Sequence, residues 1–533
     1  MSRVHVKNKK NGVTYVYEST SYWDKEKKQP RNTRTCIGKL DPETSEIIYN
    51  KRYRERQEIE TAKKQAGRPV TTEHQRLFYG TTYLFDRIVE RTGVKADLQK
   101  HFGSLSDSIL SLAYYLVLED KVPLSRFGRW ARTHVHPLGK DIPSQRSSDV
   151  FRSITEDAKQ RFFLSQSQRR AEEEYLIYDT TSISSYSQIL KQVKYGLNKD
   201  HDPLAQINLA LLLGHRSRLP VSYRKLAGNI ADVTTIKKLL HDVKYLLPNK
   251  PMFVLDRGFY SQENVNALYT NHYKFLLSVK TSLRWVQTVW EAIRPAMEDY
   301  SHYSHVHGLY MCSKRVEWDY RYTRTRNGEK VQGKRRLYLH LYYDDQRATD
   351  EKIRFNRLLD RLEEELRTNQ RQSKHEKMYA HYFHIHTTPK RGIQIIPNEE
   401  AIKARREHFG YFALMSNHIK DPGEALEIYR NKDVIEKAYD DLKNRLSMRR
   451  TLVSTEESLE GKLFVQFIAL IIIAYIKKKM DEENLFKKYT LQGLLDELDV
   501  IEQFTHPHSA SVIGEVTKKQ QELYKKLGVE GIS

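Results

Sequence analysis

The sequence is poor in cysteine: Cys36 and Cys312 are the only two in 533 residues. They lie far apart and in no metal-ligand spacing, which argues against a disulfide framework and against a zinc finger. The N-terminus also lacks the apolar stretch of a signal peptide. We therefore expect a protein of the reducing cytoplasm.

A hydrophobic run long enough to cross a bilayer is missing as well. The most apolar stretch, residues 463–476, is shorter than the about 20 residues that a membrane span requires. Three lysines, at 477–479, follow it directly. This pattern favours a buried core helix over residues 462–476. We expect no membrane partner.

Acidic residues are too few to balance the basic ones. The chain has 68 Asp and Glu against 90 Lys and Arg, a formal net charge of +22. Such an excess repels itself unless a polyanion neutralises it, and nucleic acid is the usual partner. A membrane surface would require a basic amphipathic helix or a lipidation signal, and the sequence shows neither.

The chain is too long for a single core, which usually stops growing at about 250–300 residues. Strand-like and helix-like patterns alternate in its second half, which is typical of a mixed α/β sheet. We expect a basic β-rich module (1–66), a helical domain for DNA binding or dimerisation (67–170), a catalytic core in two parts (171–281 and 409–480), a β-rich insertion outside the catalytic sheet (282–408) and a helical tail (481–533). The basic module either contacts DNA or presents a solvated, charged surface.

Two carboxylates are predicted at the ends of buried-type strands. Asp179 follows the apolar stretch YLIY, and Asp256 follows MFVL. Burying a lone carboxylate costs several kcal/mol unless it is paired or binds a cation, so such positions favour functional groups. The alternative is a turn former or helix cap. Arg257, next to Asp256, contacts DNA or pairs with Asp179, and we favour a structural role.

A third carboxylate, Glu436, lies in a predicted long helix over residues 424–446. Tyr429, Lys432 and Lys443 stand seven before, four before and seven after it. At 3.6 residues per turn the four side chains fall within about 60° of each other, on one face. The helix can therefore present a carboxylate flanked by two cations and a phenol. The alternative is a solvated face with ordinary surface ion pairs.

In these motifs the chain resembles the DDE transposases of bacterial insertion sequences. The first motif is YDTTSISSYS with Asp179, and the second is VLDRGFYSQENV with Asp256. The third is the group's Tyr-x2-Arg-x3-Glu-x6-Lys signature, which appears here as YRNKDVIEKAYDDLK. Lys432 replaces the usual arginine, which keeps the charge but loses the bidentate fork. The resemblance covers about residues 170–480 and implies an RNase H-like catalytic core.

The resemblance also implies a mechanism. Asp179, Asp256 and Glu436 would hold two Mg²⁺ ions, which Mn²⁺ can replace. Water, and later a DNA 3′-hydroxyl, would be the nucleophile. Lys432 and Lys443 would neutralise phosphates, and Tyr429 would stack on or hydrogen-bond the DNA end. The implied partners are terminal inverted repeats and target DNA, with a homodimer in the complex, in the bacterial nucleoid.

Three readings remain open alongside this one. A catalytically idle DNA-binding protein could derive from a transposase, although the intact acidic triad argues against it. A metal-dependent nuclease without strand transfer could use the same fold. Two histidine groups, His302, His305 and His307, and His381, His384 and His386, have a spacing that could bind zinc, but they fit a β surface or phosphate contacts better.

Overall fold

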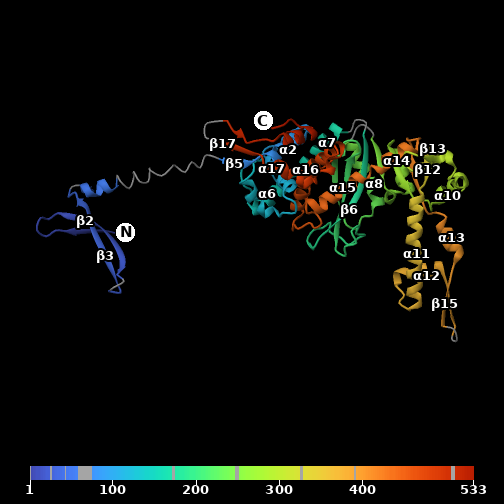
Figure 1. The fold of residues 1–533 in the computed structure, drawn as a ribbon, viewed down its shortest axis with the longest axis horizontal. Coiled ribbons are helices and arrows are strands. Elements are labelled where there is room, and N and C mark those ends of the chain that lie inside the picture. The colour runs from blue at the N-terminus through green and yellow to red at the C-terminus, as the bar shows by residue number, and fades with distance from the viewer. Residues whose placement is uncertain are drawn as a thin grey trace. The chain divides into compact units, whose positions relative to one another are not determined.

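The computed structural model describes residues 2–24, 27–42, 44–57, 75–170, 174–246, 251–323, 328–388, 392–505 and 510–532. The chain divides into two compact units, which we describe separately. Unit 1 contains Met1–Gln75 and Thr505–Ser511, and unit 2 contains Arg76–Phe504 and Val512–Ser533. Figure 1 shows the labelled elements of both units.

Unit 1 is built on an antiparallel sheet with the strand order β1-β2-β3-β4. The strands are β1 (Ser2–Lys7), β2 (Thr14–Asp24), β3 (Gln29–Leu40) and β4 (Ile47–Tyr49). The alternating stretch VTYVYEST, predicted as a strand, is part of β2. Val16 of β2 and Ile37 of β3 are buried. Tyr53, in the helical segment 51–57, donates a hydrogen bond to Glu18 at 3.3 Å.

Helices form the first part of unit 2. They are α2 (Gly80–Arg91), α3 (Val94–Phe102), α4 (Leu105–Leu118), α5 (Phe127–Ala131), α6 (Ser144–Ser153) and α7 (Glu156–Arg170). Gly93 after the helical stretch FYGTTYLFDRIVERT predicts a helix stop. The structure confirms it, because Gly93 has a φ of 72° and separates α2 from α3. Three C-terminal helices join them: α16 (Glu456–Glu482), α17 (Leu491–Asp499) and α18 (Lys518–Lys526).

The helix α16 lies in the core of unit 2, packed against α4, α6 and the sheet. By length and composition it could cross a membrane, but most of its apolar stretch is buried inside the fold. Its residues from Leu463 to Ile473 are all buried. The prediction of a buried core helix is therefore confirmed, and the helix is longer than the apolar run because its polar ends reach the surface.

A nine-stranded mixed sheet forms the centre of unit 2, in the order β11-β12-β13-β16-β10-β9-β6-β7-β8. Its strands are β6 (Tyr175–Ser184), β7 (Gln206–Gly214), β8 (Pro220–Ala227), β9 (Met252–Leu255), β10 (Lys274–Val279), β11 (Tyr303–Ser304), β12 (Leu309–Thr323), β13 (Lys330–Tyr343) and β16 (Tyr411–Ser416). Strand β9 runs parallel to both β6 and β10. The other pairs are antiparallel. The unit is therefore a mixed α/β structure with one large sheet, as expected.

Helices connect and cover these strands. They are α8 (Asp232–Leu246), α9 (Gln262–Thr270), α10 (Arg284–Ile293), α14 (Pro422–Arg430) and α15 (Asp433–Asp440). Ser261 before the helical stretch QENVNALYT predicts an N-cap. The structure confirms it, because the Ser261 hydroxyl accepts a hydrogen bond from the Asn264 backbone at 3.1 Å. A small sheet of β5 (Gln75–Phe78), β17 (Glu502–Thr505) and β18 (Val512–Ile513) lies near the helical part.

Residues 282–408 differ from the expected insertion outside the sheet. Strand β13 pairs with β16 from Tyr338↔Ser416 to Tyr343↔Tyr411, and β12 pairs with β13. The two long strands thus extend the central sheet, because β16 offers them an apolar edge that needs a hydrogen-bonding partner. That pairing is a long-range contact that a local pattern cannot predict.

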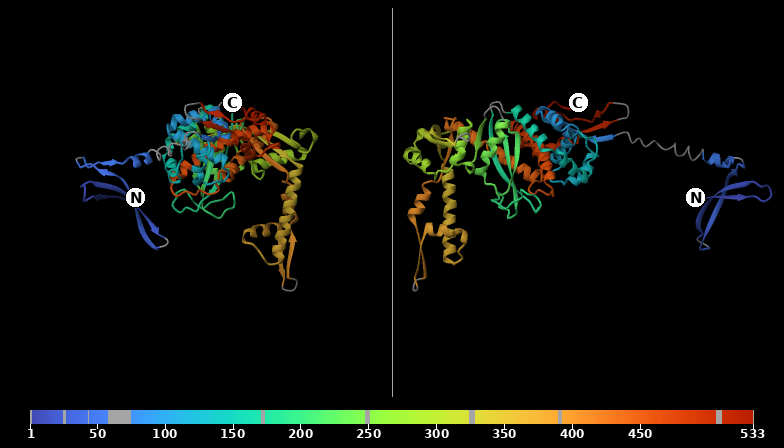
Figure 2. Two further views of the ribbon diagram at one scale, coloured as in Figure 1. Left: turned by 60° about the vertical axis from the view of Figure 1, so that its left-hand side comes forward. Right: turned by 180° about the vertical axis from the view of Figure 1, so that it is seen from behind.

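The second half of the same segment is mainly helical. It contains α11 (Asp345–Arg367), α12 (Glu376–Tyr382), the hairpin β14 (Phe383–Thr388) and β15 (Gly392–Pro397), and α13 (Glu399–Arg406). These elements project from the sheet in both views of Figure 2. The alternating stretch KMYAHYFHIHTT, residues 377–388, predicts a strand. Their first half is instead α12, because Tyr379 is buried against Leu362 and Leu366 of α11.

Candidate active site

A cavity of about 1490 Å³ opens along one edge of the central sheet. All six residues that the sequence singled out line it: Asp179, Asp256, Tyr429, Lys432, Glu436 and Lys443. They come from two strands and from the region of α14 and α15. Segments separated by more than 170 residues in the chain therefore meet at one place.

Asp179 lies within β6 and is mostly buried. Burial raises the pKa of its carboxyl group, and the nearby ammonium groups of Lys199 and Lys432 only partly oppose this. The Tyr439 hydroxyl donates a hydrogen bond to the Asp179 backbone oxygen at 2.6 Å. This hydrogen bond ties the backbone at Asp179 to α15.

The predicted strand end at Asp179 is wrong. Strand β6 continues to Ser184, and residues 180–184, which are small and polar except for Ile183, are buried and pair with β7 as far as Ser184↔Gln206. The polar side chains of this stretch suggested a turn, whereas in the fold they find hydrogen-bond partners inside the protein. The Asn198 side chain, for example, donates a hydrogen bond to the Ser184 hydroxyl at 3.1 Å.

Asp256 directly follows β9, as predicted. Its Oδ1 accepts a hydrogen bond from the Tyr429 hydroxyl at 2.8 Å, and its Oδ2 lies 3.2 Å from the Lys432 Nζ. Burial alone would raise the pKa of this carboxyl group. The Lys432 ammonium and the Tyr429 hydroxyl outweigh burial, and the pKa is lowered below its usual value. Asp256 is therefore held as a carboxylate.

Glu436 lies on α15 with 63% of its side chain exposed. Its Oε1 is 3.7 Å from the Lys432 Nζ, so Lys432 lies between Glu436 and Asp256. Lys432 itself is buried, and its ammonium also lies over the Tyr429 ring. One cation thus links two of the three carboxylates.

The expected single helix over residues 424–446 is broken. Helix α14 ends at Arg430, α15 begins at Asp433, and the segment η6 (Asp441–Arg445) is a π-helix. Lys432 sits in the break between α14 and α15, where it reaches Asp256. The four signature side chains still face one cavity, although the helical wheel that predicted this does not describe the backbone.

Lys443 is buried, not on a solvated face. Its Nζ lies 2.7 Å from Asp200 Oδ2, in the loop between β6 and β7. Lys443 therefore has a carboxylate partner in the structure. A phosphate bound in the cavity would have to compete with Asp200 for this ammonium.

Two further residues beside Asp179 were not predicted from the sequence. The Lys199 Nζ is 3.6 Å from Asp179 Oδ1 and 3.1 Å from Asp232 Oδ2, and it donates to the Thr180 backbone oxygen at 2.6 Å. Asp232 also accepts a hydrogen bond from Thr180. The charged loop KDHD, residues 199–202, was the available signal. The ion pairs of Lys199 with Asp179 and Asp232 could not be predicted from the local spacing of residues.

Arg257 does not take the structural role that we favoured. It is exposed, lines the cavity and makes no salt bridge to Asp179 or to another acid of the described residues. Asp179 takes Lys199 as its partner.

A metal site must be judged from the donor groups, because divalent ions prefer carboxylate oxygens. Within the described ranges, no three His, Cys, Asp or Glu side chains are arranged closely enough to hold a metal ion. The three carboxylates do share one cavity, and Lys199 and Lys432 place ammonium groups against them. The carboxylates suit a divalent ion by type, and their present partners are the ammonium groups of Lys199 and Lys432.

The histidine groups have other surroundings. His302 hydrogen-bonds the Ala296 backbone oxygen at 2.8 Å, His305 pairs with the Tyr300 hydroxyl at 2.9 Å, and His307 lies 3.7 Å from Glu427. His384 and His386 lie on β14 and point to one side of the hairpin, because alternate residues of a strand share a face.

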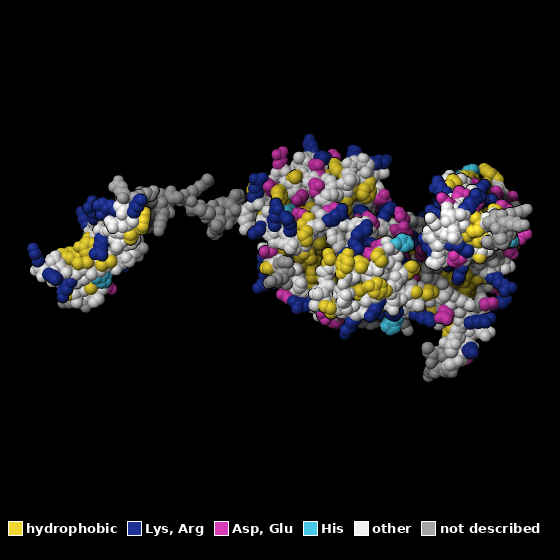
Figure 3. Space-filling view, turned by 90° about the horizontal axis from the view of Figure 1, so that it is seen from below, with side chains coloured by type: hydrophobic (Ala, Val, Ile, Leu, Met, Phe, Trp, Pro, Cys, Tyr) yellow, Lys and Arg dark blue, Asp and Glu magenta, His cyan; other side chains and the backbone are white. Residues whose placement is uncertain are grey.

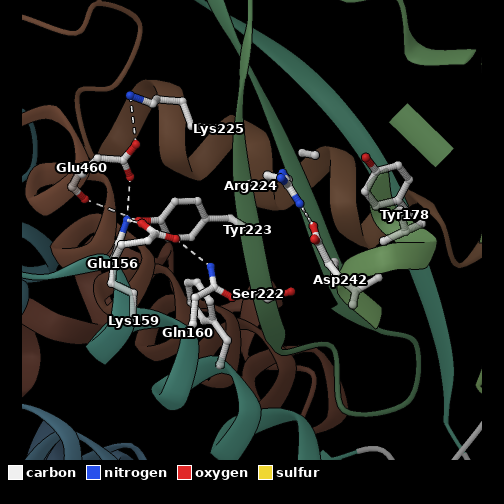
Figure 4. Close-up of a pocket in the computed structure, with 14 residues that line it drawn as sticks. Glu156, Lys159, Gln160, Tyr178, Ser222, Tyr223, Arg224, Lys225, Asp242 and Glu460 are labelled. Atoms are coloured by element: carbon white, nitrogen blue, oxygen red, sulfur yellow. Dashed lines mark hydrogen bonds and ion pairs between the residues drawn. The ribbon is translucent and has the colours of Figure 1, made fainter. Parts of the chain in front are cut away.

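A second cavity, of about 380 Å³, lies beside β8 and is shown in Figure 4. Its charged side chains are paired with one another. The Lys159 Nζ is 2.6 Å from Glu460, and the Lys225 Nζ is 2.9 Å from the same carboxylate. These pairs join α7, β8 and α16. We refer to Glu156, Lys159, Lys225, Glu456 and Glu460 as the inner ion-pair network.

Comparison with known proteins identifies the central part of the chain. Residues 170–472, more than half of its length, match the family model described as the transposase DDE domain. No curated protein sequence matches. Among solved structures, a piggyBac transposase synaptic complex with hairpin DNA matches with a TM-score of 0.36 and 11% identity, covering 74% of this chain and 70% of that one. On the family match, the chain belongs to the DDE transposase family and is an enzyme, a transposase.

Proposed function

We propose that this transposase cleaves the ends of a bacterial insertion sequence and joins them to target DNA. One observation carries the proposal: Asp179, Asp256 and Glu436 line one cavity together with the Tyr429, Lys432 and Lys443 of the signature. The cavity lies within the segment that matches the family. We further propose that the central sheet is an RNase H-like catalytic core.

The three carboxylates would hold two Mg²⁺ ions, which Mn²⁺ can replace. When bound, such ions supply positive charge at the scissile phosphate and make a water more acidic. Asp256 is prepared for this role, because its lowered pKa keeps it ionised. Asp179 lies deeper, and burial makes its ionised form less favourable unless a cation is near.

Lys432 would act in two ways. Without DNA its ammonium lies between Asp256 and Glu436 and limits their mutual repulsion. With DNA it would turn to the phosphate beside the scissile bond. Because lysine is a point charge without the planar fork of arginine, we expect one phosphate contact and not a bidentate one. Tyr429 would keep Asp256 oriented through its hydroxyl group and contact the DNA end.

The proposed partners are terminal inverted repeats and target DNA, bound by a homodimer. Residues 1–66 would supply a basic DNA-binding module, and residues 67–170 would bind DNA or form the dimer. Counterion release from phosphates explains why a chain with a net charge of +22 is suited to this. The location would be the cytoplasm, at the bacterial nucleoid.

A strand-transfer assay tests the proposal. Duplexes that end in a free 3′-hydroxyl at the terminal repeat are incubated with the protein, Mg²⁺ and a target plasmid. We expect covalent joining that depends on the divalent ion and that Glu436→Gln abolishes. Cleavage of uncut ends without joining would identify a nuclease. DNA binding with neither reaction would identify an idle, transposase-derived protein.

A further inference from the structure

The cavity continues beyond the carboxylates along the same sheet edge. Strand β10 is parallel to β9, so its end lies beside Asp256. Strand β16 is antiparallel to β10, with Val279 opposite Ala413, so its beginning lies at the same edge. Beyond it, the cavity is lined by residues of α11 and α13. The cavity thus extends along the strand ends, from the three acids to residues of α11 and α13.

Three cations stand along this edge and line the cavity. Arg257 follows Asp256, Lys280 follows β10, and Arg405 lies on α13. All three side chains are exposed. None makes a salt bridge to an acid in the part of the chain that the structure describes. They are basic groups with no carboxylate partner, directed at the cavity of a DNA enzyme.

Four of the other cations of the cavity are paired. A fifth, Arg449, follows η6 and so lies outside this row of strand ends, and its Nε donates a hydrogen bond to the Asn444 Oδ1 at 2.6 Å. Lys199, Lys432 and Lys443 each lie within 4 Å of a carboxylate. Arg347 of α11 is 3.0 Å from Glu351 and stacks over Phe412 at 5.1 Å. A phosphate would have to displace an acid from each of these four. It would meet Arg257, Lys280 and Arg405 without that cost.

Exposure alone does not mark a DNA contact. Lys and Arg side chains are spread over the face of the molecule shown in Figure 3. The three residues differ because they line one cavity in a row. Arg405 is on α13, which leads into the beginning of β16. Neighbouring strands lie about 4.8 Å apart, so the distance from the end of β9 to the beginning of β16 is about 10 Å. At 3.4 Å per base pair this equals about three base pairs of DNA.

We propose that Arg257, Lys280 and Arg405 form a phosphate track, which holds the DNA about three base pairs to one side of the scissile phosphate. The inference rests on the proposed function, because it assumes that DNA enters this cavity. It adds a binding site on the side of α11 and α13. The track positions DNA and does not touch the reacting atoms.

A positioning role predicts a change in binding and not in chemistry. The track contacts phosphates equally before and during the reaction, which lowers KM without raising kcat. Removing all three cations should therefore raise KM for a terminal-repeat duplex at least tenfold. We expect kcat to change less than about twofold.

The first experiment measures DNA affinity against salt concentration for the triple variant Arg257→Ala, Lys280→Ala and Arg405→Ala. Each lost phosphate contact should reduce the slope of log K against log salt by about 0.9, and three should reduce it by about 2.7. Lys488→Ala is the control. Lys488 is exposed and does not line the cavity, so its variant should keep the wild-type slope and KM.

The second experiment varies the DNA. Duplexes are shortened by one base pair at a time on either side of the scissile bond. For the wild type, affinity should drop when one flank becomes shorter than about three base pairs. For the triple variant, that step should be absent, because nothing remains to hold the removed phosphates. The melting temperature of the variant should equal that of the wild type.

The outcomes separate the two proposals. If the wild type neither cleaves nor joins DNA with Mg²⁺, the proposed function fails. If the wild type is active and the triple variant keeps its KM, salt slope and flank dependence, the phosphate track is wrong. A fall in kcat at unchanged KM would also overturn it, since the residues would then act in the transition state.

Discussion

The candidate active-site cavity and the inner ion-pair network both pair buried lysines with carboxylates, yet they differ in how exposed the acids are. In the network, Lys159 and Lys225 share Glu460, which is 27% exposed, and the pairs join α7, β8 and α16. Only Glu156, a second partner of Lys159, is 63% exposed. In the cavity, Lys432 and Lys443 are about as buried, but their partners face open space: Glu436 is 63% exposed and Asp200 45%. The first arrangement fastens layers together. The second, in our proposal, can exchange its carboxylates for DNA phosphates.

The difference can be tested by removing one member from each region. Loss of a cavity residue should affect catalysis and leave the free energy of unfolding nearly unchanged. Loss of a network residue should do the reverse, because an unpaired buried charge destabilises the fold. The following four predictions run from the largest expected effect to the smallest.

The largest effect is expected for Glu436→Gln. The substitution removes a charge that a divalent ion would need, and we expect DNA cleavage to fall at least about a thousandfold, about 4 kcal/mol of transition-state stabilisation. The melting temperature should stay within a degree or so, since the side chain is largely exposed. Glu427→Gln, on α14 and outside the cavity, is the control. Cleavage at the wild-type rate would remove Glu436 from the site.

Lys159→Met should have the opposite pattern. Lys159 is buried with two carboxylate partners, Glu156 and Glu460. Breaking a buried pair by removing one partner costs about 3–5 kcal/mol, although the partial exposure of the glutamates favours the low end. Urea unfolding measures this loss, and Lys100→Met, at an exposed position of α3, should lose far less. An unchanged unfolding midpoint would show that the network does not hold the layers.

Lys443→Ala should reduce cleavage by about 2–3 kcal/mol, or roughly a hundredfold, if the residue holds a phosphate at the DNA end. DNA affinity should fall much less, because other cations remain. The fold should persist, since Asp200 can be solvated. The matched control is Lys437→Ala on α15, whose side chain is exposed and pairs with Asp433. Equal cleavage by wild type and Lys443→Ala would leave the Asp200 pair as the only role of Lys443.

The smallest effect concerns acid stability. Burial would raise the pKa of Glu460, but Lys159 and Lys225 outweigh it and the pKa is lowered. Its stabilisation is therefore fully present above the unfolded pKa of about 4.3 and is lost as the pH falls through the lower, folded value. Glu460→Gln should flatten the decline of unfolding free energy between about pH 5 and 3. Glu457→Gln, at an exposed position, should leave the decline as steep as in the wild type.

Local patterns predicted the elements that depend on local chemistry. The apolar run at 463–476 gave a buried helix, Ser261 a helix cap, and the strand before Asp256 a buried strand. In each case a few neighbouring residues decide the outcome. The large mixed sheet also followed from the alternation of strands and helices.

What the sequence could not predict depends on distant partners. Strands β12 and β13 joined the sheet because β16 offered an edge, and β6 continued past Asp179 because β7 pairs with it. The pairs Lys199–Asp232 and Lys443–Asp200 link residues more than 30 and 240 positions apart. The signature residues were identified by resemblance. Ion-pair partners such as Lys199 for Asp179 and Asp200 for Lys443 could be identified only in the folded chain.

The π-helical segment Asp441–Arg445 has a consequence for how such signatures evolve. A π turn contains about one residue more than an α turn, so it commonly arises by insertion into an existing helix. Such a turn takes up the extra residue within itself, so deleting one residue from it should restore an α-helix and leave the direction of the following residues nearly unchanged. Where a π turn intervenes, the number of residues between two positions does not by itself fix their relative direction. In this chain Glu436 and Lys443 are seven positions apart, and both line the cavity although the π-helical segment begins between them.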